Sequence, residues 1–354
     1  MSLSGLLTYV PSCLPTSYKP DPDISTQAQL YITSCISMNP NFVSDLPEWT
    51  HDVPAMIQIV QDICTTALSL PVLDIRSLTC GFKDLLGEGG YGGVYSCKVE
   101  GTVVAVKKQC RYTYANALKE IAIMSTLDHS NIEKVLGICF TTDASYFSMQ
   151  LRKTSLHRLL YPVHTNSVFA DYIWVKNQPR PYSHLLSLER RRHIGKQLLK
   201  GLQYIHSMGV IHADIKPGNI LLDNEDRVKI SDFGISTYSP LTNTREEMIP
   251  PCTSHYRPIE HLTYSCKSYG YEVDMWACGL VLMEMEVGCH PINSSGDPSD
   301  EYMRTQYLKI FGKDGDVTPK CLGVSTFASL CMSMIRYDPS SRTTASEAYN
   351  VWPR

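Results

Sequence analysis

Four polar residues in the second half of the sequence have the types and spacing that phosphoryl transfer needs: Asp214, Lys216, Asn219 and Asp232. Such a transfer needs a carboxylate to accept or orient a hydroxyl proton, and a cation to offset charge on the transferred group. Magnesium ions, which accompany nucleotide phosphates, take amide and carboxylate oxygens as ligands. We therefore predict that Asp214 is the base and Lys216 the cation. Asn219 and Asp232 are the predicted metal ligands.

A glycine-rich run in the first half of the sequence has the composition of a phosphate-binding loop. Its predicted contact residues are Gly87, Glu88, Gly89, Gly90, Tyr91, Gly92 and Val94. Glycines lack a Cβ atom, so backbone amides approach phosphate oxygens closely. A dinucleotide-binding loop would continue into a helix, and a Walker A loop into Gly-Lys-Ser or Gly-Lys-Thr, and this run does neither. Taken alone, it is equally a glycine-rich hairpin that binds nothing.

The elements around these residues fall into a β-rich first part and a helical second part. Short β-branched runs over 82–108 predict antiparallel strands joined by a tight turn. An apolar stripe predicts a helix over 115–127, and further strands follow at 134–140 and 145–151. Apolar residues at three- and four-residue intervals predict a long helix over 188–209. The predicted fold class is therefore α+β, with a small β-rich lobe and a larger helical lobe.

We predict one catalytic domain preceded by an extension. Residues 1–75, rich in Pro, Ser, Thr and Asp, form the extension, to which the sequence assigns no role. The domain would span 76–354, with a first lobe at about 76–151 and a second at about 152–354. Residues 161–187 lack sustained periodicity and are rich in Pro and Tyr, so we predict an insertion there, either a docking element or a tolerated loop.

In their order and spacing, these motifs resemble the eukaryotic protein kinase family over roughly residues 82–349. Asp274, in a D-x-W-x-x-G run, is similar to an aspartate that pins the catalytic-loop backbone. Arg342 resembles an arginine that pairs with a glutamate at the end of the activation segment, here Glu260. The resemblance implies the bilobal kinase fold, ATP with Mg²⁺ or Mn²⁺ as cofactors, and transfer of the γ-phosphoryl group to hydroxyls of protein substrates.

The resemblance also implies which residues contact the nucleotide. Lys107 would hold the α- and β-phosphates, with Glu120 on the following helix as the partner of its ammonium. The two are closer in sequence than in most kinases, so the front of that helix is predicted to be trimmed. Val94 and Ala105 would cover the adenine base. The remaining adenine contacts are predicted at Met149, behind the base, and at backbone groups of Gln150, Leu151 and Arg152.

The residues around the predicted base indicate the substrate class. Lys216, two residues beyond Asp214, together with Thr253 ahead of a Y-R-x-x-E segment, is typical of serine/threonine kinases. Thr253 is predicted to hydrogen-bond near Asp214 and Lys216. The segment 255–262, HYRPIEHL, resembles the branch of cyclin-dependent and mitogen-activated kinases, and Arg257 within it points to proline-directed substrates.

Ala213 stands where this family usually has an arginine, which binds a phosphorylated activation loop. We therefore predict that activity does not need phosphorylation of Thr242, Thr244 or Thr253. The usual A-P-E is Pro258-Ile259-Glu260 here, which keeps the glutamate. Such departures occur in divergent kinases, viral ones among them.

Composition argues for an intracellular enzyme. A formal net charge of −3 over 354 residues opposes a nucleic-acid binder, which is normally strongly basic. The 13 cysteines are odd in number and scattered, with no C-x-x-C pair, so we predict reduced thiols. The sequence shows no secretory signal, myristoylation glycine or run of about 18 apolar residues, which predicts no membrane segment. A cytosolic or nuclear location follows, in a host cell if the protein is viral, and no regulatory partner is evident.

Two other functions compete with that of an active protein kinase. Ala213 and the short helix would also suit a pseudokinase or scaffold, but such a protein normally loses the residues that bind phosphate and metal, and all of these are present. A small-molecule kinase of similar fold is disfavoured, because the segment from Thr253 to Glu260 and the D-x-W-x-x-G helix belong to enzymes with protein substrates. An active serine/threonine protein kinase is therefore the main prediction.

Overall fold

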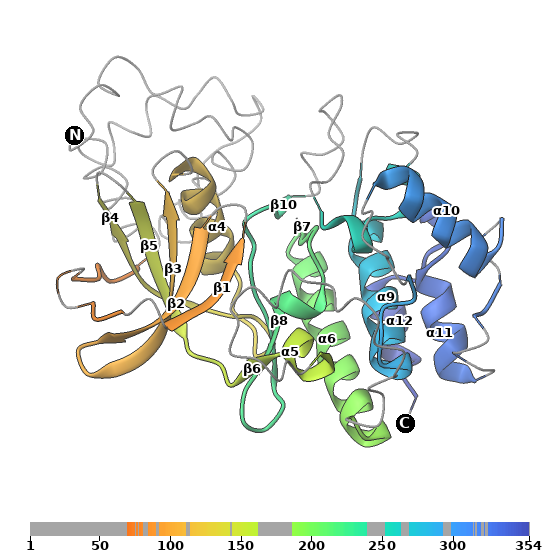
Figure 1. Ribbon diagram of the computed structural model, residues 1–354, viewed down its shortest axis with the longest axis horizontal. Helices are drawn as coiled ribbons and strands as arrows, with labels where there is room; N and C mark the ends of the chain where they lie inside the picture. The colour runs from red at the N-terminus through yellow and green to blue at the C-terminus, as the bar shows by residue number, and fades with distance from the viewer. Residues whose placement is uncertain are drawn as a thin grey trace, which may run out of the picture. The chain divides into compact units, whose positions relative to one another are not determined.

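The computed structural model divides the chain into two compact units, whose elements are drawn in Figure 1. Unit 1 consists of the described residues up to Thr126 together with Lys134–Gln150, and unit 2 of Leu127–Glu133 together with the described residues from Leu151 onward. The residues that the structure describes are 69–74, 76, 78–80, 84–89, 92–110, 114–141, 144–161, 186–238, 252–262, 269–292, 299–313, 315, 317–319, 322 and 325–353. Most of the predicted extension and of the predicted insertion lies outside them, so both remain predictions.

Unit 1 is built on a five-stranded sheet in which the strand order is β1-β2-β3-β5-β4 and neighbouring strands are antiparallel. Its strands are β1 (Leu85–Gly89), β2 (Gly92–Val99), β3 (Thr102–Cys110), β4 (Val135–Phe140) and β5 (Ala144–Gln150). β3 pairs with β2 on one side and with β5 on the other, so it lies in the middle of the sheet (Figure 1). The strands predicted for the first part of the chain are confirmed.

A two-residue turn joins β2 to β3. Val99 and Thr102 face each other across the ladder. Between them, Glu100 and Gly101 both have positive φ angles, of 49° and 83°. Tight hairpins favour this geometry because its twist matches that of the flanking strands, and Gly101 adopts it at no steric cost. The turn predicted from the sequence is confirmed, and it sets the register of β3, which carries Lys107.

Helix α4 (Tyr114–Thr126) packs against the sheet of unit 1. Its inner face is apolar and buried: Ala117, Leu118, Ile121, Ala122, Ile123 and Met124. This wide apolar stripe holds the helix on the strands. The helix predicted over 115–127 is confirmed to within one residue at each end. Glu120 is only 1% exposed on the same helix, so its carboxylate requires partners inside the unit.

The prediction that all cysteines are reduced thiols is wrong for one pair in unit 1. Thr79 and Lys98 exchange two backbone hydrogen bonds, of 3.2 and 3.1 Å, which brings Cys80 next to Cys97 on β2. The two sulfur atoms are bonded, with the Cα atoms 4.6 Å apart. Strand pairing creates this contact, and a sequence separation of 17 carries no local signal of it. The predicted cytosolic or nuclear location loses the support that reduced cysteines lent it.

Unit 2 is mainly helical. Its helices are α5 (Leu156–Leu160), α6 (Leu188–Ser207), α8 (Ile259–Leu262), α9 (Glu272–Val287), α10 (Asp300–Phe311), α11 (Thr326–Met334) and α12 (Ala345–Asn350). Short strands and 3₁₀ turns connect them: β6 (Thr154–Ser155), β7 (Val210–Ile211), η8 (Pro217–Asn219), β8 (Ile220–Leu222), β9 (Val228–Ile230), β10 (Thr237–Tyr238), η9 (Ser254–Tyr256) and η11 (Pro339–Ser341). The helix predicted over 188–209 is confirmed as α6, and Gly209 follows it with a φ of 75° that suits glycine.

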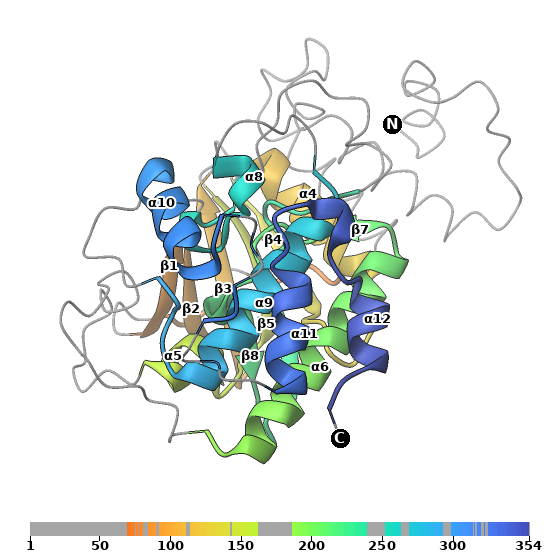
Figure 2. The same cartoon turned by 90° about the vertical axis from the view of Figure 1, so that its right-hand side faces the viewer.

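Helix α9 forms the core of unit 2. Its residues Val273–Met285 are all buried, and it packs against α6 and α11 (Figure 2). Trp276 is fully buried on it and meets the ring of Tyr307 on α10 edge-on, with centroids 5.1 Å apart. A helix that is apolar on all sides is expected to be buried on all sides. In the part of the chain that the structure describes, no helix has the length and apolar character needed to cross a membrane.

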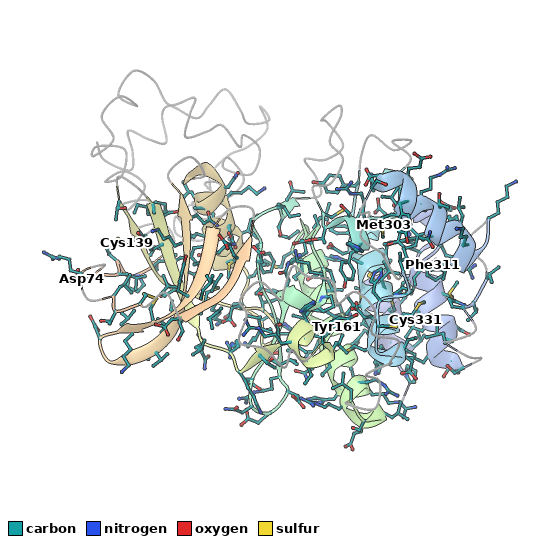
Figure 3. All side chains as sticks on the ribbon, in the orientation of Figure 1. Asp74, Cys139, Tyr161, Met303, Phe311 and Cys331 are labelled. Carbon is teal, nitrogen blue, oxygen red and sulfur yellow. A yellow bond between two sulfur atoms is a disulfide. The ribbon has the colours of Figure 1, made fainter. Side chains whose placement is uncertain are left out.

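A buried carboxyl group near the end of α9 ties three segments together. Glu284 is 0% exposed and accepts hydrogen bonds from the phenols of Tyr161, which follows α5 (Figure 3), and of Tyr256 in η9. The Tyr161 oxygen in turn accepts a hydrogen bond of 2.9 Å from the backbone N–H of His290. Burial raises the pKa of Glu284 to about 7, although the two phenols act in the other direction.

The substitution Glu284→Gln is expected to change how stability depends on pH. The folded pKa of about 7 lies above the usual value of 4.5, so the folded protein keeps a proton that the unfolded chain releases between these values. Glu284 therefore ionises more readily in the unfolded chain, which lowers the free energy of unfolding as the pH rises from about 5 to about 8. The glutamine variant lacks this loss. We expect the variant-minus-wild-type difference in unfolding free energy, from urea titrations, to increase over that window.

Buried histidines do not disturb this comparison. Burial lowers the pKa of His255 to about 4 and that of His290 to about 3, so both reduce stability on acidification. They are present in both proteins and cancel in the difference. A difference that stays constant from about pH 5 to about pH 8 would contradict the role assigned to Glu284.

Candidate active site

Three side chains of unit 2 meet around the carboxylate of Asp214, and we call the four residues the Asp214 cluster: Asp214, Lys216, Asn219 and Thr253. Oδ1 of Asp214 accepts hydrogen bonds from the Thr253 hydroxyl at 2.7 Å and from the Thr253 backbone N–H at 3.2 Å. Oδ2 accepts from the Asn219 amide at 3.0 Å and lies 2.7 Å from the Lys216 ammonium. The same ammonium donates to the Thr253 hydroxyl at 2.8 Å. The predicted contact of Thr253 with Asp214 and Lys216 is confirmed.

Short local elements hold the side chains of the Asp214 cluster. Asn219 ends η8, which begins at Pro217, and the fixed φ of proline suits the first position of a helical turn. The Asn219 amide also donates to the backbone oxygen of Asp214 at 2.9 Å, and Ser231 donates twice to the backbone oxygen of Asn219, at 3.0 and 3.1 Å. Because the Asn219 nitrogen is used within the protein, its side-chain oxygen is the group suited to a metal ion.

Asp232 follows Ser231 in the segment after β9. Its φ angle is 66°, in the left-handed region that residues other than glycine rarely adopt. The next residue, Phe233, is fully buried and packs edge-on against His212, with ring centroids 4.7 Å apart. This packing anchors the turn and leaves Asp232 half-buried. A carboxylate and an amide oxygen fit magnesium, which takes few protein ligands where phosphates supply the others.

Asp274 on α9 holds the backbone that precedes Asp214. Its Oδ2 accepts from the backbone N–H of His212 at 2.8 Å, and its Oδ1 from that of Ala213 at 2.7 Å. The Nε2 atom of His206 lies 2.9 Å from Oδ2. Ala213 has a φ of 66°, a conformation that costs energy for alanine and that these bonds maintain. The prediction that Asp274 pins this backbone is confirmed.

A buried ion pair holds the segment that carries Thr253. Glu260 on α8 accepts two hydrogen bonds from the guanidinium of Arg342, at 2.7 and 2.6 Å, and the two side chains are 7% and 1% exposed. The guanidinium also lies over the ring of Trp276, 4.9 Å from its centroid, and donates to the carbonyl of Glu272 at 3.1 Å. The predicted pairing of Arg342 with Glu260 is confirmed. Because both charges are buried, each depends on the other.

In unit 1, the ammonium of Lys107 lies against the carboxylate of Glu120, at 2.7 and 2.8 Å from its two oxygens. The side chains are 9% and 1% exposed, and the predicted pair is confirmed. Helix α4 begins at Tyr114, so Glu120 lies in its second turn, as the short sequence spacing indicated. Sequence reasoning missed Gln109, whose amide donates to Glu120 at 2.8 Å. Its signal was the spacing of two residues from Lys107, which places both side chains on one face of β3.

The glycine-rich run forms the β1–β2 hairpin. Its described members lie on these strands: Gly87, Glu88, Gly89, Gly92 and Val94. Two members lie outside the described residues: Gly90 and Tyr91. At Gly92 the φ angle is 148°, and a Cβ atom there would lie 2.0 Å from the carbonyl oxygen of Lys108, so only glycine fits. The predicted antiparallel strands of the run are confirmed as β1 and β2, and phosphate binding by the run stays a prediction.

The residues predicted to contact adenine lie on β3, on β5 and just after it. Ala105 on β3 pairs with Met149 on β5, and both are buried. The other three follow in the chain: Gln150, which ends β5, Leu151 and Arg152. The guanidinium of Arg152 binds Glu133 through two hydrogen bonds of 2.6 and 2.9 Å, a buried contact that the sequence analysis missed. The predicted role of Arg152 toward adenine therefore falls to its backbone.

The family model of the protein kinase domain matches residues 81–352. The chain belongs to the protein kinase family. The match takes in every motif around the Asp214 cluster and around Lys107, and it confirms both the predicted resemblance and the predicted α+β kinase fold. The chemical roles of the individual residues remain predictions.

Curated relatives of this kinase come from several organisms. Cyclin-dependent kinase 1 of Encephalitozoon cuniculi is 26% identical over 76% of this chain and 94% of its own length. The CTD kinase subunit alpha of Saccharomyces cerevisiae is 31% identical over 56% of this chain and 35% of its own length. A leucine-rich repeat receptor-like serine/threonine-protein kinase of Arabidopsis thaliana is 28% identical over 69% of this chain. This kinase spans only 26% of the length of that plant relative.

A solved structure is also similar to this kinase. The yeast RNA Pol II CTD kinase CTDK-1 complex contains a chain that matches with a TM-score of 0.57 at 25% identity. The match covers 72% of this chain and 87% of that chain. Kinases of the cyclin-dependent branch are therefore among the relatives, as the segment 255–262 indicated.

Removal of the charge on Glu260 is expected to destabilise this kinase strongly. In Glu260→Gln the buried guanidinium of Arg342 loses its counter-charge while the size of the side chain is kept. Breaking a buried pair in this way costs about 3 kcal/mol or more. We expect the free energy of unfolding, measured by urea titration at pH 7, to fall by that order.

A matched control uses an exposed pair in the same unit. Glu225 lies 2.9 Å from Arg227, and their side chains are 65% and 64% exposed. Water replaces such a contact readily, so Glu225→Gln is expected to leave stability unchanged within error. Equal losses in the two variants would show that burial of the Glu260 pair is not what matters.

Proposed function

We propose that this kinase transfers the γ-phosphoryl group of Mg-ATP to serine and threonine hydroxyls of protein substrates. The observation that carries the proposal is the hydrogen bond from the Thr253 hydroxyl to Asp214, 2.7 Å between oxygens. The ammonium of Lys216 contacts both partners. The contact supports the view that Asp214 accepts an aliphatic hydroxyl beside a fixed cation, which is what the attacking group of a serine or threonine substrate requires.

The roles proposed for the Asp214 cluster and Asp232 follow from their chemistry. Asp214 would orient the attacking hydroxyl and take its proton, while Lys216 would offset the charge that develops on the transferred group. Asn219 and Asp232 would hold magnesium, which when bound offsets charge on the phosphates. Positioning and electrostatics then supply most of the rate enhancement, since little covalent chemistry falls to the protein.

Residues of unit 1 and those that follow β5 would bind the nucleotide. Lys107 would hold the phosphates, with Glu120 keeping its ammonium in place. The other proposed contacts are those named from the sequence: Gly87, Glu88, Gly89, Gly90, Tyr91, Gly92, Val94, Ala105, Met149, Gln150, Leu151 and Arg152. We propose a catalytic domain at 76–354, with lobes at about 76–151 and about 152–354.

The serine/threonine assignment rests on Lys216 and Thr253, and relatives named as serine/threonine-protein kinases support it. Substrate sequence preference stays open. Arg257, which indicated proline-directed substrates, binds Asp300 at 2.8 and 3.0 Å and the carbonyl of Cys252 at 3.1 Å. Its guanidinium therefore supports the backbone next to Thr253, and a preference for proline remains a prediction.

The substitution Asp214→Asn tests the proposed reaction. The amide keeps the size of the carboxylate but accepts no proton, so transfer of labelled γ-phosphate to a generic basic protein is expected to fall about 100-fold or more. Phosphoamino-acid analysis of the wild-type product should show phosphoserine and phosphothreonine. Glu225→Gln, an exposed change of the same chemistry, should keep wild-type activity. Equal incorporation by wild type and Asp214→Asn, or label on tyrosine alone, would overturn the proposal.

Activity is expected to survive phosphatase treatment. Ala213 presents no cation to a phosphorylated activation loop, so phosphate on that segment has no partner there. We expect turnover within about twofold of the untreated enzyme, with mass spectrometry confirming removal of phosphate, and the same for Thr242→Ala combined with Thr244→Ala. Thr253→Ser, which keeps the hydroxyl that contacts Asp214, should also remain active. Loss of turnover on dephosphorylation, with full activity in a sample treated with inactivated phosphatase, would contradict this prediction.

A further inference from the structure

Gln109 is a buried polar residue that the proposed mechanism does not use. It lies on β3, 1% exposed, with its backbone paired to Gly92 on β2 and Ser145 on β5. Its amide nitrogen donates to Oε2 of Glu120 at 2.8 Å, whereas its amide oxygen has no hydrogen-bond partner within the described part of the chain. Burial of an unpaired amide oxygen reduces stability, so packing alone does not account for a glutamine here. Its contribution lies in the bond from its nitrogen.

Strand β3 holds the carboxylate of Glu120 with two side chains. Lys107 donates to both carboxylate oxygens, and Gln109 donates to one of them. An ammonium is a compact charge that accepts many orientations of a carboxylate, so Lys107 alone does not fix the plane of the group. A second donor from a fixed position on the same strand does fix it. Helix α4 begins at Tyr114, fewer than two turns before Glu120, so the hydrogen bonds from β3 hold the helix near its start.

We propose that Gln109 is a positioning residue that holds the carboxylate of Glu120 on Lys107 and thereby sets the place of the Lys107 ammonium. The inference rests on the proposed function, in which that ammonium binds ATP phosphates. Gln109 acts only through Glu120. Without the Gln109 amide, the Glu120 carboxylate could turn away from β3. The Lys107 ammonium would then lose the contact with Glu120 that sets its position.

The first experiment removes the donor and keeps the bulk. Gln109→Met has a similar length but no N–H group, so a hydrogen bond to a charged group is lost, and kcat/KM for Mg-ATP is expected to fall about tenfold or more. Ser145→Ala is the matched control, because Ser145 lies opposite Gln109 on the same face and is fully buried. The Ser145 hydroxyl has no hydrogen-bond partner among the described residues, so its removal should change kcat/KM by less than about twofold.

The substitution Gln109→Glu is expected to make kcat/KM depend on pH, which a role of Gln109 in packing alone would not do. Two adjacent carboxylates cannot both ionise easily, so the pKa of one of them rises. The protonated form donates where the amide did, and the ionised form repels Glu120. The ratio of variant to wild-type kcat/KM is therefore expected to rise as the pH falls from about 8 to about 6. A ratio that does not change with pH, together with wild-type kinetics in Gln109→Met, overturns the proposal.

Crystal structures of wild type and Gln109→Met separate this inference from the proposed function. If the wild-type protein transfers no phosphate, the proposed function fails, but the contact between Lys107 and Glu120 still reports on Gln109. Separation of the ammonium and the carboxylate beyond hydrogen-bond distance in a folded variant supports the proposal. Distances that stay at 2.7 and 2.8 Å in the variant overturn it.

Discussion

Asp274 lies in the first turn of helix α9, which is buried along most of its length. The Asp274 carboxylate accepts hydrogen bonds from two backbone N–H groups in the segment that leads to Asp214. A loop that presents polar side chains to a substrate has little apolar surface with which to pack. Two hydrogen bonds donated to one rigid carboxylate fix both the position and the orientation of this loop, and they maintain the unusual backbone of Ala213. The geometry of the Asp214 cluster therefore depends on α9.

Other buried carboxylates act in the same way. Glu120 is held by Lys107 and Gln109, and Glu260 by Arg342. Burying a charge without a partner costs much free energy, so loss of the partner of either carboxylate would strongly destabilise the fold. Exposed pairs lack this property because water competes for both members. The contacts that hold the candidate site are consequently also those on which the stability of the fold depends.

Short-range patterns were sufficient to predict most of the fold and much of the site. The helix around Glu120, the strands around Lys107 and the hairpin of the glycine-rich run each show a local periodicity or turn signal, so they appeared where the sequence placed them. The segment from Asp214 to Asn219 is contiguous, so its candidate site residues were also predicted from the sequence. The contacts of Gln109, the pair of Glu133 with Arg152 and the bond between Cys80 and Cys97 were missed, because their partners are separated in sequence and meet only when strands and helices pack.

By itself, the sequence determined the protein kinase family, the α+β class and the positions of the main strands and helices, since these depend on residue types at short, regular spacing. The tertiary structure alone decided which cysteines are bonded, which glutamine supports Glu120 and which tyrosines meet Glu284. Burial is the physical reason for this division. A polar group needs a specific partner only after packing has removed water, and spacing along the chain does not encode that three-dimensional proximity.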